Sequence, residues 1–328
     1  MSFALIQGQD RAVQNLKQSL QRDKLHHAYI FSGPEGVGKK KTAVELIKAL
    51  NCDRSGPEGA CDQCPSCQKI EKQIHPDFIH LKPEGVNIRI EQIRNLGQQL
   101  AYGPVMGRSR PCLLDMASDL NDPAGNAFLK TLEEPPPGTL FVLLVRDPGE
   151  LLPTLVSRCV SIVFNPLPLS LIAGQLVEVK GLSRDEARAL SLVSGGSLGR
   201  AFEFLKTDFW KKQEAWITQL EGLPQAGFTQ LFSWAKSWLG SREEIRENLE
   251  IGQWCIRDLI WVSAGLEEKV SLLPHLRERV RTLAFSLPDT VWLKRLTLLN
   301  QAAVYQTKNV NAQLNWEVLF LKMARVSF

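Results

Sequence analysis

The sequence predicts an α/β domain built on a parallel sheet, followed by helical domains. In the first half of the chain, short apolar runs alternate with helical patterns, which is typical of a parallel sheet covered on both faces. A glycine-rich loop joins the first predicted strand to a helix, as in phosphate-binding α/β domains. Beyond residue 207, apolar residues recur at helical spacing, and all eight tryptophans lie in this part of the chain.

The predicted strands are apolar runs bounded by glycine, proline or charged residues. They cover residues 28–32, 78–81, 112–115, 140–145 and 160–164. Helical patterns lie between them, for example at residues 12–20, 40–50 and 91–100. Pro166 and Pro168 break the alternation and indicate a linker, so we place the α/β domain at residues 1–165.

Two helical domains are predicted after the linker. Ser183 and Glu186 have the spacing of a capping box, which starts a helix, and Gly195 and Gly196 separate that helix from the next one. We expect residues 166–206 to form a small helical domain. Residues 207–328 are expected to form a larger all-helical domain, whose tryptophans pack in the core and at interfaces rather than around a ligand.

The composition is that of an ordinary globular protein. The chain has 328 residues, 44% of them apolar and 23% charged, which predicts two or three domains. No apolar run reaches membrane-spanning length and the first residues lack a signal-peptide pattern, so we expect a cytoplasmic protein without a membrane partner. The net charge of +4 does not by itself indicate nucleic acid.

The loop at residues 33–39 reads GPEGVGK and has the pattern of a phosphate-binding P-loop. Gly33, Gly36 and Gly38 allow backbone N–H groups to close around a phosphate, and Lys39 can reach the outer phosphates of a nucleotide. The N-terminus of the following helix adds a favourable dipole. Two interpretations stay open: residual ATP binding, or a loop that is kept only as a structural turn.

Two positions that ATP hydrolysis requires carry unsuitable side chains. The residue after the P-loop lysine normally supplies a hydroxyl to Mg²⁺, but here it is Lys40, and Thr42 lies two places too late. Asp115 ends an apolar strand, as the second phosphate-site acid should, but the next residue is Met116 instead of a second carboxylate that would polarise water. We therefore predict no intrinsic ATPase activity.

Four cysteines, Cys52, Cys61, Cys64 and Cys67, lie in a short segment with two C-x2-C steps. Four thiolates match the tetrahedral preference of Zn²⁺ and leave no open position, so we predict a structural zinc module at residues 51–68. Reduced structural cysteines or a redox pair are the alternatives. The remaining cysteines are expected to be buried; they are Cys112, Cys159 and Cys255.

Several stretches together resemble the clamp-loader branch of the AAA+ proteins, which belongs to the bacterial DNA polymerase III holoenzyme. The resemblance covers most of residues 1–206. It rests on the four-cysteine insertion and on the stretches IQGQ at 6–9, HHAYIFSG at 26–33, HPDF at 75–78, NAFLKTLEEP at 126–135, LPTLVSRC at 152–159 and GGSLGRA at 195–201. The resemblance implies a P-loop domain with a zinc insertion, a helical lid domain and a helical collar domain.

The resemblance also implies roles for single residues. Arg158, in the Ser-Arg-Cys motif, is expected to project into the ATP site of a neighbouring motor subunit as an arginine finger. Arg200 begins the sensor-2 helix of the vestigial nucleotide site, and Val145 replaces a polar sensor. Arg89 and Arg94 either follow a DNA phosphate backbone or belong to a plain amphipathic helix with a solvated face.

The function that the resemblance implies is that of a non-hydrolysing subunit of the DNA polymerase III clamp loader. Such a complex loads the sliding clamp onto primed DNA, and its polymerase holoenzyme is a nucleotidyltransferase. The expected partners are motor subunits of the gamma/tau type, a delta subunit, the clamp and primed DNA. An active gamma/tau-type ATPase is the alternative. A phosphotransferase is a weaker one, because it leaves the cysteine insertion and Ser-Arg-Cys unexplained.

Overall fold

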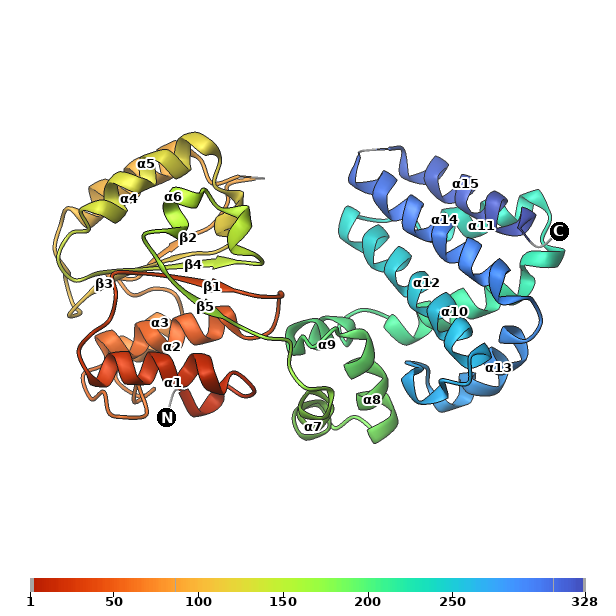
Figure 1. Cartoon of the computed structure of the whole chain (residues 1–328), viewed down its shortest axis with the longest axis horizontal. Helices are drawn as coiled ribbons and strands as arrows, with labels where there is room; N and C mark the ends of the chain where they lie inside the picture. Colours follow the sequence, from red (N-terminus) through yellow and green to blue (C-terminus); the bar gives the residue numbers. More distant parts are fainter. Residues whose placement is uncertain (1–2, 86, 309, 327–328) are drawn as a thin grey trace. The chain divides into compact units, whose positions relative to one another are not determined.

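The computed structural model describes residues 3–85, 87–308 and 310–326 (Figure 1). The chain divides into two compact units. The first comprises Met1–Pro168 with Gly196–Gly199, and the second comprises Leu169–Gly195 with Arg200–Phe328. A separate small domain at residues 166–206 stays a prediction. Within the described residues, no helix is long and apolar enough to cross a membrane.

The first unit is built on a five-stranded sheet in the order β2-β3-β4-β1-β5. All neighbouring strands pair in parallel, so the predicted parallel sheet is confirmed. The strands are β1 (Ala28–Ser32), β2 (Ile79–Leu81), β3 (Arg110–Leu114), β4 (Thr139–Val145) and β5 (Val160–Val163). β1 lies between β4 and β5, so the P-loop follows an interior strand of the sheet, while β5 forms one edge.

Helices cover both faces of this sheet (Figure 1). They are α1 (Asp10–Gln21), α2 (Lys39–Asn51), α3 (Pro65–Glu71), α4 (Ile90–Leu100), α5 (Asp122–Glu133) and α6 (Pro153–Val156). Alternate residues of the fully buried β1 enter two different cores, as period-two side chains require. Phe31 packs in the core with the apolar faces of α1 and α2. Ile30 packs in the core with those of α4 and α5.

A buried carboxylate shapes the loop between α4 and β3. Asp77 is fully buried and accepts hydrogen bonds from the backbone N–H groups of Val105, Met106 and Gly107, at 2.6, 2.8 and 2.6 Å. Burial opposes its charge, but these three donors lower the pKa of Asp77 below its usual value. The HPDF stretch at 75–78 therefore holds the loop that precedes β3, the strand that Asp115 follows.

The second unit is entirely helical in its described residues. Its helices are α7 (Leu169–Lys180), α8 (Arg184–Val193), α9 (Leu198–Phe204), α10 (Phe209–Gly222), α11 (Phe228–Ser237), α12 (Arg242–Ser263), α13 (Arg277–Ala284), α14 (Asp289–Thr307) and α15 (Ala312–Arg325). The predicted capping box at α8 is confirmed, because Ser183 N donates to Glu186 Oε2 at 2.9 Å and Glu186 N donates to Ser183 Oγ at 3.3 Å.

Aromatic side chains fill the core of this unit. Trp216 stacks on Trp238 with ring centroids 5.2 Å apart, and Trp316 and Phe320 lie 5.9 and 5.8 Å from Trp216. The indole N–H of Trp216 donates to Asn248 O at 2.9 Å, so burying that ring leaves its donor satisfied. Core packing of tryptophans is confirmed at these positions.

Candidate functional site

The P-loop connects β1 to α2 and needs glycine at specific positions. Gly33, Gly36 and Gly38 have φ angles of 138°, 71° and 108°, which side chains with a Cβ rarely adopt. A Cβ on Gly33 would lie 2.1 Å from the backbone oxygen of Phe164, after β5. The loop therefore keeps the backbone shape that its sequence predicts. This shape by itself fits both open interpretations, nucleotide binding and a structural turn.

Lys39, the P-loop lysine, is turned toward the loop itself. Its Nζ donates to the carbonyl oxygen of Gly33 and, at 2.7 Å, to that of Pro34. The residue is only 8% exposed, and burial lowers its pKa below the usual lysine value. The ammonium group thus satisfies carbonyls of its own loop.

Lys40 forms an ion pair with the acid that follows β3. Its Nζ lies 2.7 Å from Oδ2 of Asp115, and His80 Nε2 lies 3.4 Å from the same oxygen, within ion-pair distance but without hydrogen-bond alignment. The His80 ring and the Lys40 ammonium lower the pKa of Asp115 to about 2, against the effect of burial. An ammonium group therefore neutralises the carboxylate that would assist Mg²⁺ in an active P-loop site.

Three further positions around this site carry side chains that do not suit ATP hydrolysis. Thr42 is buried, and its Oγ1 donates to Gly38 O at 2.9 Å within the helix. Met116 is 49% exposed and has a left-handed backbone with φ 53°. Val145 is buried at the end of β4, paired with Ser32 of β1. None of these three side chains can act as a general base.

An ion pair that sequence reasoning missed links the P-loop to the end of β4. Arg146 donates from Nε and Nη2 to Oε1 of Glu35, at 3.1 and 2.5 Å. The two residues are 111 positions apart in the chain. Arg146 directly follows Val145, and its carbonyl accepts from Gly33 N at 3.0 Å, so the strand end and the loop are tied together twice.

Arg158 lies between α6 and β5, at the edge of the sheet. Its Nη1 donates to Thr154 O at 2.9 Å and to Ser157 Oγ at 3.3 Å. Its Nη2 lies 2.7 Å from Oε1 of Glu133, at the end of α5, and its side chain is 37% exposed. The guanidinium therefore sits at the surface, held by an acid of its own chain.

A cavity of about 480 Å³ opens beside Arg158. His26, His27, Glu133 and Cys159 are among its lining residues.

Cys159 is only half-buried, so the expected burial is confirmed for Cys112 and Cys255 but not for Cys159.

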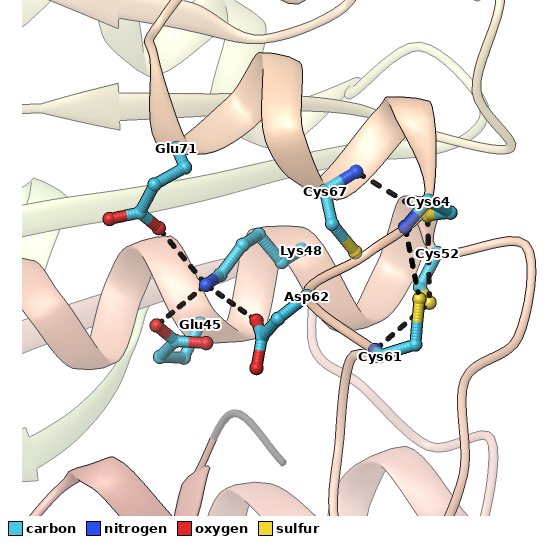
Figure 2. Close-up of polar contacts among 8 residues, drawn as sticks. All are labelled: Glu45, Lys48, Cys52, Cys61, Asp62, Cys64, Cys67 and Glu71. Atoms are coloured by element: carbon cyan, nitrogen blue, oxygen red, sulfur yellow. Dashed lines mark hydrogen bonds and ion pairs between the residues drawn. The ribbon is translucent and has the colours of Figure 1, made fainter.

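The four cysteines of the insertion come together, as Figure 2 shows. The sulfur atoms of Cys52, Cys61, Cys64 and Cys67 all lie within 4.8 Å of one another, with 4.0 Å between those of Cys52 and Cys64. Tetrahedral zinc with Zn–S bonds of about 2.3 Å places the sulfur atoms about 3.8 Å apart, close to the 4.0 Å between Cys52 and Cys64. The donor set therefore fits a metal ion such as zinc.

The backbone of the insertion is arranged around the sulfur atoms. The N–H groups of Arg54 and Cys61 each donate to Cys52 Sγ at 3.3 Å, and Cys64 N donates to Cys61 Sγ at 3.3 Å. Backbone hydrogen bonds from Gln63 and Cys64 lower the pKa of the Cys61 thiol to about 6. N–H groups directed at sulfur favour the thiolate form that a metal ion binds.

The remaining predicted residues lie on helices or next to them. Arg89 precedes α4 and Arg94 lies on its exposed side, while Ile93 and Leu96 are buried, which fits both open interpretations of this helix. Arg200 belongs to the second unit, where its Nη2 lies 2.5 Å from Oε1 of Glu250. Its part in a nucleotide site stays a prediction.

A parallel sheet with a P-loop after β1, an acid after β3 and a cysteine insertion after α2 is the α/β P-loop architecture that the sequence predicts. A family model described as DNA polymerase III, delta subunit, matches residues 8–168. This part of the chain matches a family of DNA polymerase III subunits.

Known relatives agree with this assignment. DNA polymerase III subunit delta' of Bacillus subtilis (strain 168) is 28% identical over 319 residues, which is 96% of either chain. DNA polymerase III subunit tau of Escherichia coli (strain K12) is 34% identical over 200 residues, or 60% of this chain and 31% of tau. A gamma subunit-related protein of Thermotoga maritima has the same fold, with a TM-score of 0.51 at 20% identity, over 96% of this chain and 99% of that one.

Proposed function

We propose that this chain is a non-hydrolysing subunit of the DNA polymerase III clamp loader, which places the sliding clamp on primed DNA. The observation that carries the proposal is the ion pair between Lys40 and Asp115, 2.7 Å apart. It replaces a magnesium ligand by a cation and pairs the acid that magnesium would need. With Met116 next to Asp115, the position that normally supplies a second carboxylate to activate water carries no base.

Under this proposal, Arg158 is the residue through which the subunit assists ATP hydrolysis in a neighbouring subunit. Its guanidinium lies at the sheet edge and is partly exposed, so a neighbouring subunit can reach it. A planar guanidinium stabilises charge that develops on a γ-phosphate, which a lysine does less well. Arg158 then acts in trans on a motor subunit of the gamma/tau type, while the chain's own nucleotide site is at most vestigial.

The cysteine cluster holds a structural zinc ion in this proposal, because four sulfur donors leave no position for a substrate. The helical second unit assembles with the motor and delta subunits. Arg89 and Arg94 face the DNA phosphates. The complex works in the cytoplasm, where its proposed substrate, primed DNA, is found.

A motor subunit with its own ATPase activity is the second candidate. The identity with tau and the preserved P-loop glycines favour it. The test is the complete loader, reconstituted with either this chain or its Arg158→Ala variant. We expect the variant to assemble normally but to lower DNA-stimulated ATPase and clamp loading. An arginine finger supplies on the order of 10³-fold at one site, and fingers at other sites limit the overall loss.

Two further variants sharpen this experiment. Arg158→Lys should restore little activity, because an ammonium group lacks the planar fork. Arg146→Ala is the matched control, since Arg146 is also an exposed arginine paired with a glutamate of its own chain, at the silent P-loop. Wild-type rates with Arg158→Ala would reject the donor role. A loss with Arg146→Ala instead would favour the motor subunit.

A further inference from the structure

Lys48, in the last turn of α2, places its ammonium group among three carboxylates (Figure 2). Nζ lies 2.8 Å from Glu45 Oε1, 2.8 Å from Asp62 Oδ1 and 3.0 Å from Glu71 Oε2. The lysine side chain is only 5% exposed. A buried cation is destabilising unless it is paired, so the local structure depends on these three carboxylates.

The three carboxylates come from three different segments. Glu45 lies one turn earlier on α2, Asp62 lies between Cys61 and Cys64, and Glu71 ends α3. Burial opposes the charge of Lys48, but its hydrogen bonds to these acids raise its pKa above the usual lysine value. Lys48 therefore stays charged and ties the cysteine loop to the helices on both sides of it.

The contact with Asp62 is the one that bears on the cysteines. Asp62 has a φ of 61°, in the left-handed region that non-glycine residues seldom adopt. This conformation turns the chain so that Cys64 N donates to Cys61 Sγ at 3.3 Å. The ion pair with Lys48 therefore links the residue of this turn to α2.

We propose that Lys48 is a positioning residue of the metal site, which acts through Asp62 to hold Cys61 and Cys64 in metal-binding geometry. The proposal rests on the proposed zinc site and adds residues that are not ligands. Nζ of Lys48 contacts carboxylates and not sulfur, so Lys48 is not a ligand. It acts by changing the affinity of the cysteines for the ion and the rate at which the ion is released. Residues that orient metal ligands typically contribute 10- to 100-fold to metal affinity.

The test compares zinc affinity across matched variants by competition with a chromogenic chelator. Asp62→Asn removes the charge but keeps a residue that tolerates the left-handed conformation. Lys48→Met removes the ammonium, and Lys48→Arg keeps a cation. Lys17→Met is the control, since Lys17 pairs with Glu58 of the same cysteine loop, 2.5 Å away and outside the turn between Cys61 and Cys64.

We expect Asp62→Asn and Lys48→Met to weaken zinc binding by about 10- to 100-fold, Lys48→Arg to recover part of the loss, and Lys17→Met to bind within about threefold of the parent. The double variant, Asp62→Asn with Lys48→Met, should lose no more zinc affinity than the weaker-binding of the two single variants, because both substitutions break the same contact. The visible absorption of the Co²⁺ forms should shift in the same variants, which a purely structural lysine would not cause.

Several results would overturn the inference. One is a parent chain that binds zinc while Asp62→Asn binds it equally well with an unchanged Co²⁺ spectrum. Another is an equal loss in Lys17→Met, which would make the effect general to the loop. If Lys48→Met fails to fold, Asp62→Asn decides alone, because it leaves Lys48 paired with Glu45 and Glu71. A parent chain that binds no zinc would instead reject the proposed metal site.

Discussion

The ammonium of Lys40 and the carboxylate of Asp115 form an ion pair of 2.7 Å across the two elements that hold Mg²⁺ in active P-loop sites. One residue comes from the start of α2 and the other from the end of β3, and both are only partly exposed. The pair does two things at once: it removes a hydroxyl ligand and it neutralises the acid. A site built this way keeps its fold without needing the metal.

Restoring a hydroxyl at position 40 should improve ATP binding but not hydrolysis. We expect the isolated chain to hydrolyse ATP no faster than its Lys39→Ala variant. Lys40→Thr frees Asp115 and returns a hydroxyl, so Mg²⁺-dependent ATP binding should rise on the order of tenfold, about 1.4 kcal/mol. Turnover should stay at background, because Met116 is still not a base. Phosphate release and titration with a fluorescent ATP analogue measure the two quantities.

The outcome that contradicts this expectation is specific. Mg²⁺-dependent turnover by the unmodified chain, abolished in Lys39→Ala, would show a working motor site despite Lys40 and Met116. Lys40→Ala serves as the control for Lys40→Thr, since it also frees Asp115 from the ion pair but restores no hydroxyl ligand. Equal gains in ATP binding from both variants would assign the effect to charge rather than to the hydroxyl.

The depressed pKa of Asp115 predicts how stability depends on pH. The pKa falls from 3.8 in the unfolded chain to about 2 in the folded one, so the ionised acid stabilises the fold above pH 4. This contribution, about 2 kcal/mol at neutral pH, is lost as the pH falls toward 2. Asp115→Asn should therefore lower the melting temperature at pH 6, and the difference should shrink by roughly half at pH 3.

Calorimetry can assign this transition to the correct unit. All eight tryptophans lie between Trp210 and Trp316, within the second unit, so tryptophan fluorescence follows that unit alone. The transition that shifts in Asp115→Asn should be the one without a fluorescence change. A melting difference that is as large at pH 3 as at pH 6 would show that the ionised carboxylate is not the stabilising form.

The cysteine cluster predicts a metal content. Purified chain should carry about one zinc ion, because four sulfur donors complete a tetrahedral site. Cys64→Ser should lower the metal content and speed hydrogen exchange in residues 52–67, while the sheet stays protected. Cys159→Ser is the control, as a half-buried cysteine outside the cluster. Metal-free native protein with four reactive thiols in the insertion would contradict the site.

The features that could be predicted from the sequence are those that depend on short, continuous segments. The P-loop, the strands and the cysteine insertion each depend on residues within about one element, so their patterns are visible locally. The partners were not predictable in this way. Lys40 and Asp115 lie 75 positions apart, and the pairing of Arg146 with Glu35 spans 111 positions. Such contacts exist only because parallel strands bring distant segments to the same sheet edge.

Two of the sequence stretches that resemble clamp-loader proteins contain residues whose contacts the sequence did not predict. Asp77 lies in HPDF at 75–78, and its three backbone donors come from a loop 28 to 30 positions further on. Glu133 lies in NAFLKTLEEP at 126–135 and meets Arg158 from another element. A motif marks where such a residue is, but only the fold shows which group it contacts.

The pairing of Glu133 with Arg158 leads to a prediction about the proposed trans site. Before Arg158 can contact a neighbour's γ-phosphate, its guanidinium must leave a carboxylate 2.7 Å away. Both side chains are substantially exposed, so this competition amounts to at most about 1 kcal/mol. Glu133→Gln removes the charge, and the contacts of Arg158 with Thr154 and Ser157 can stay in place.

In a reconstituted loader, Glu133→Gln should therefore lower the ATP concentration that gives half-maximal ATPase rate, by about two- to fivefold. The neighbouring Glu134→Gln is the control, because Glu134 is exposed and carries the same charge change. The decisive comparison is in the Arg158→Ala background, where Glu133→Gln should have no effect, since the group it competes for is gone. The same shift in that background would show that Glu133 acts on the complex by a route that does not pass through Arg158.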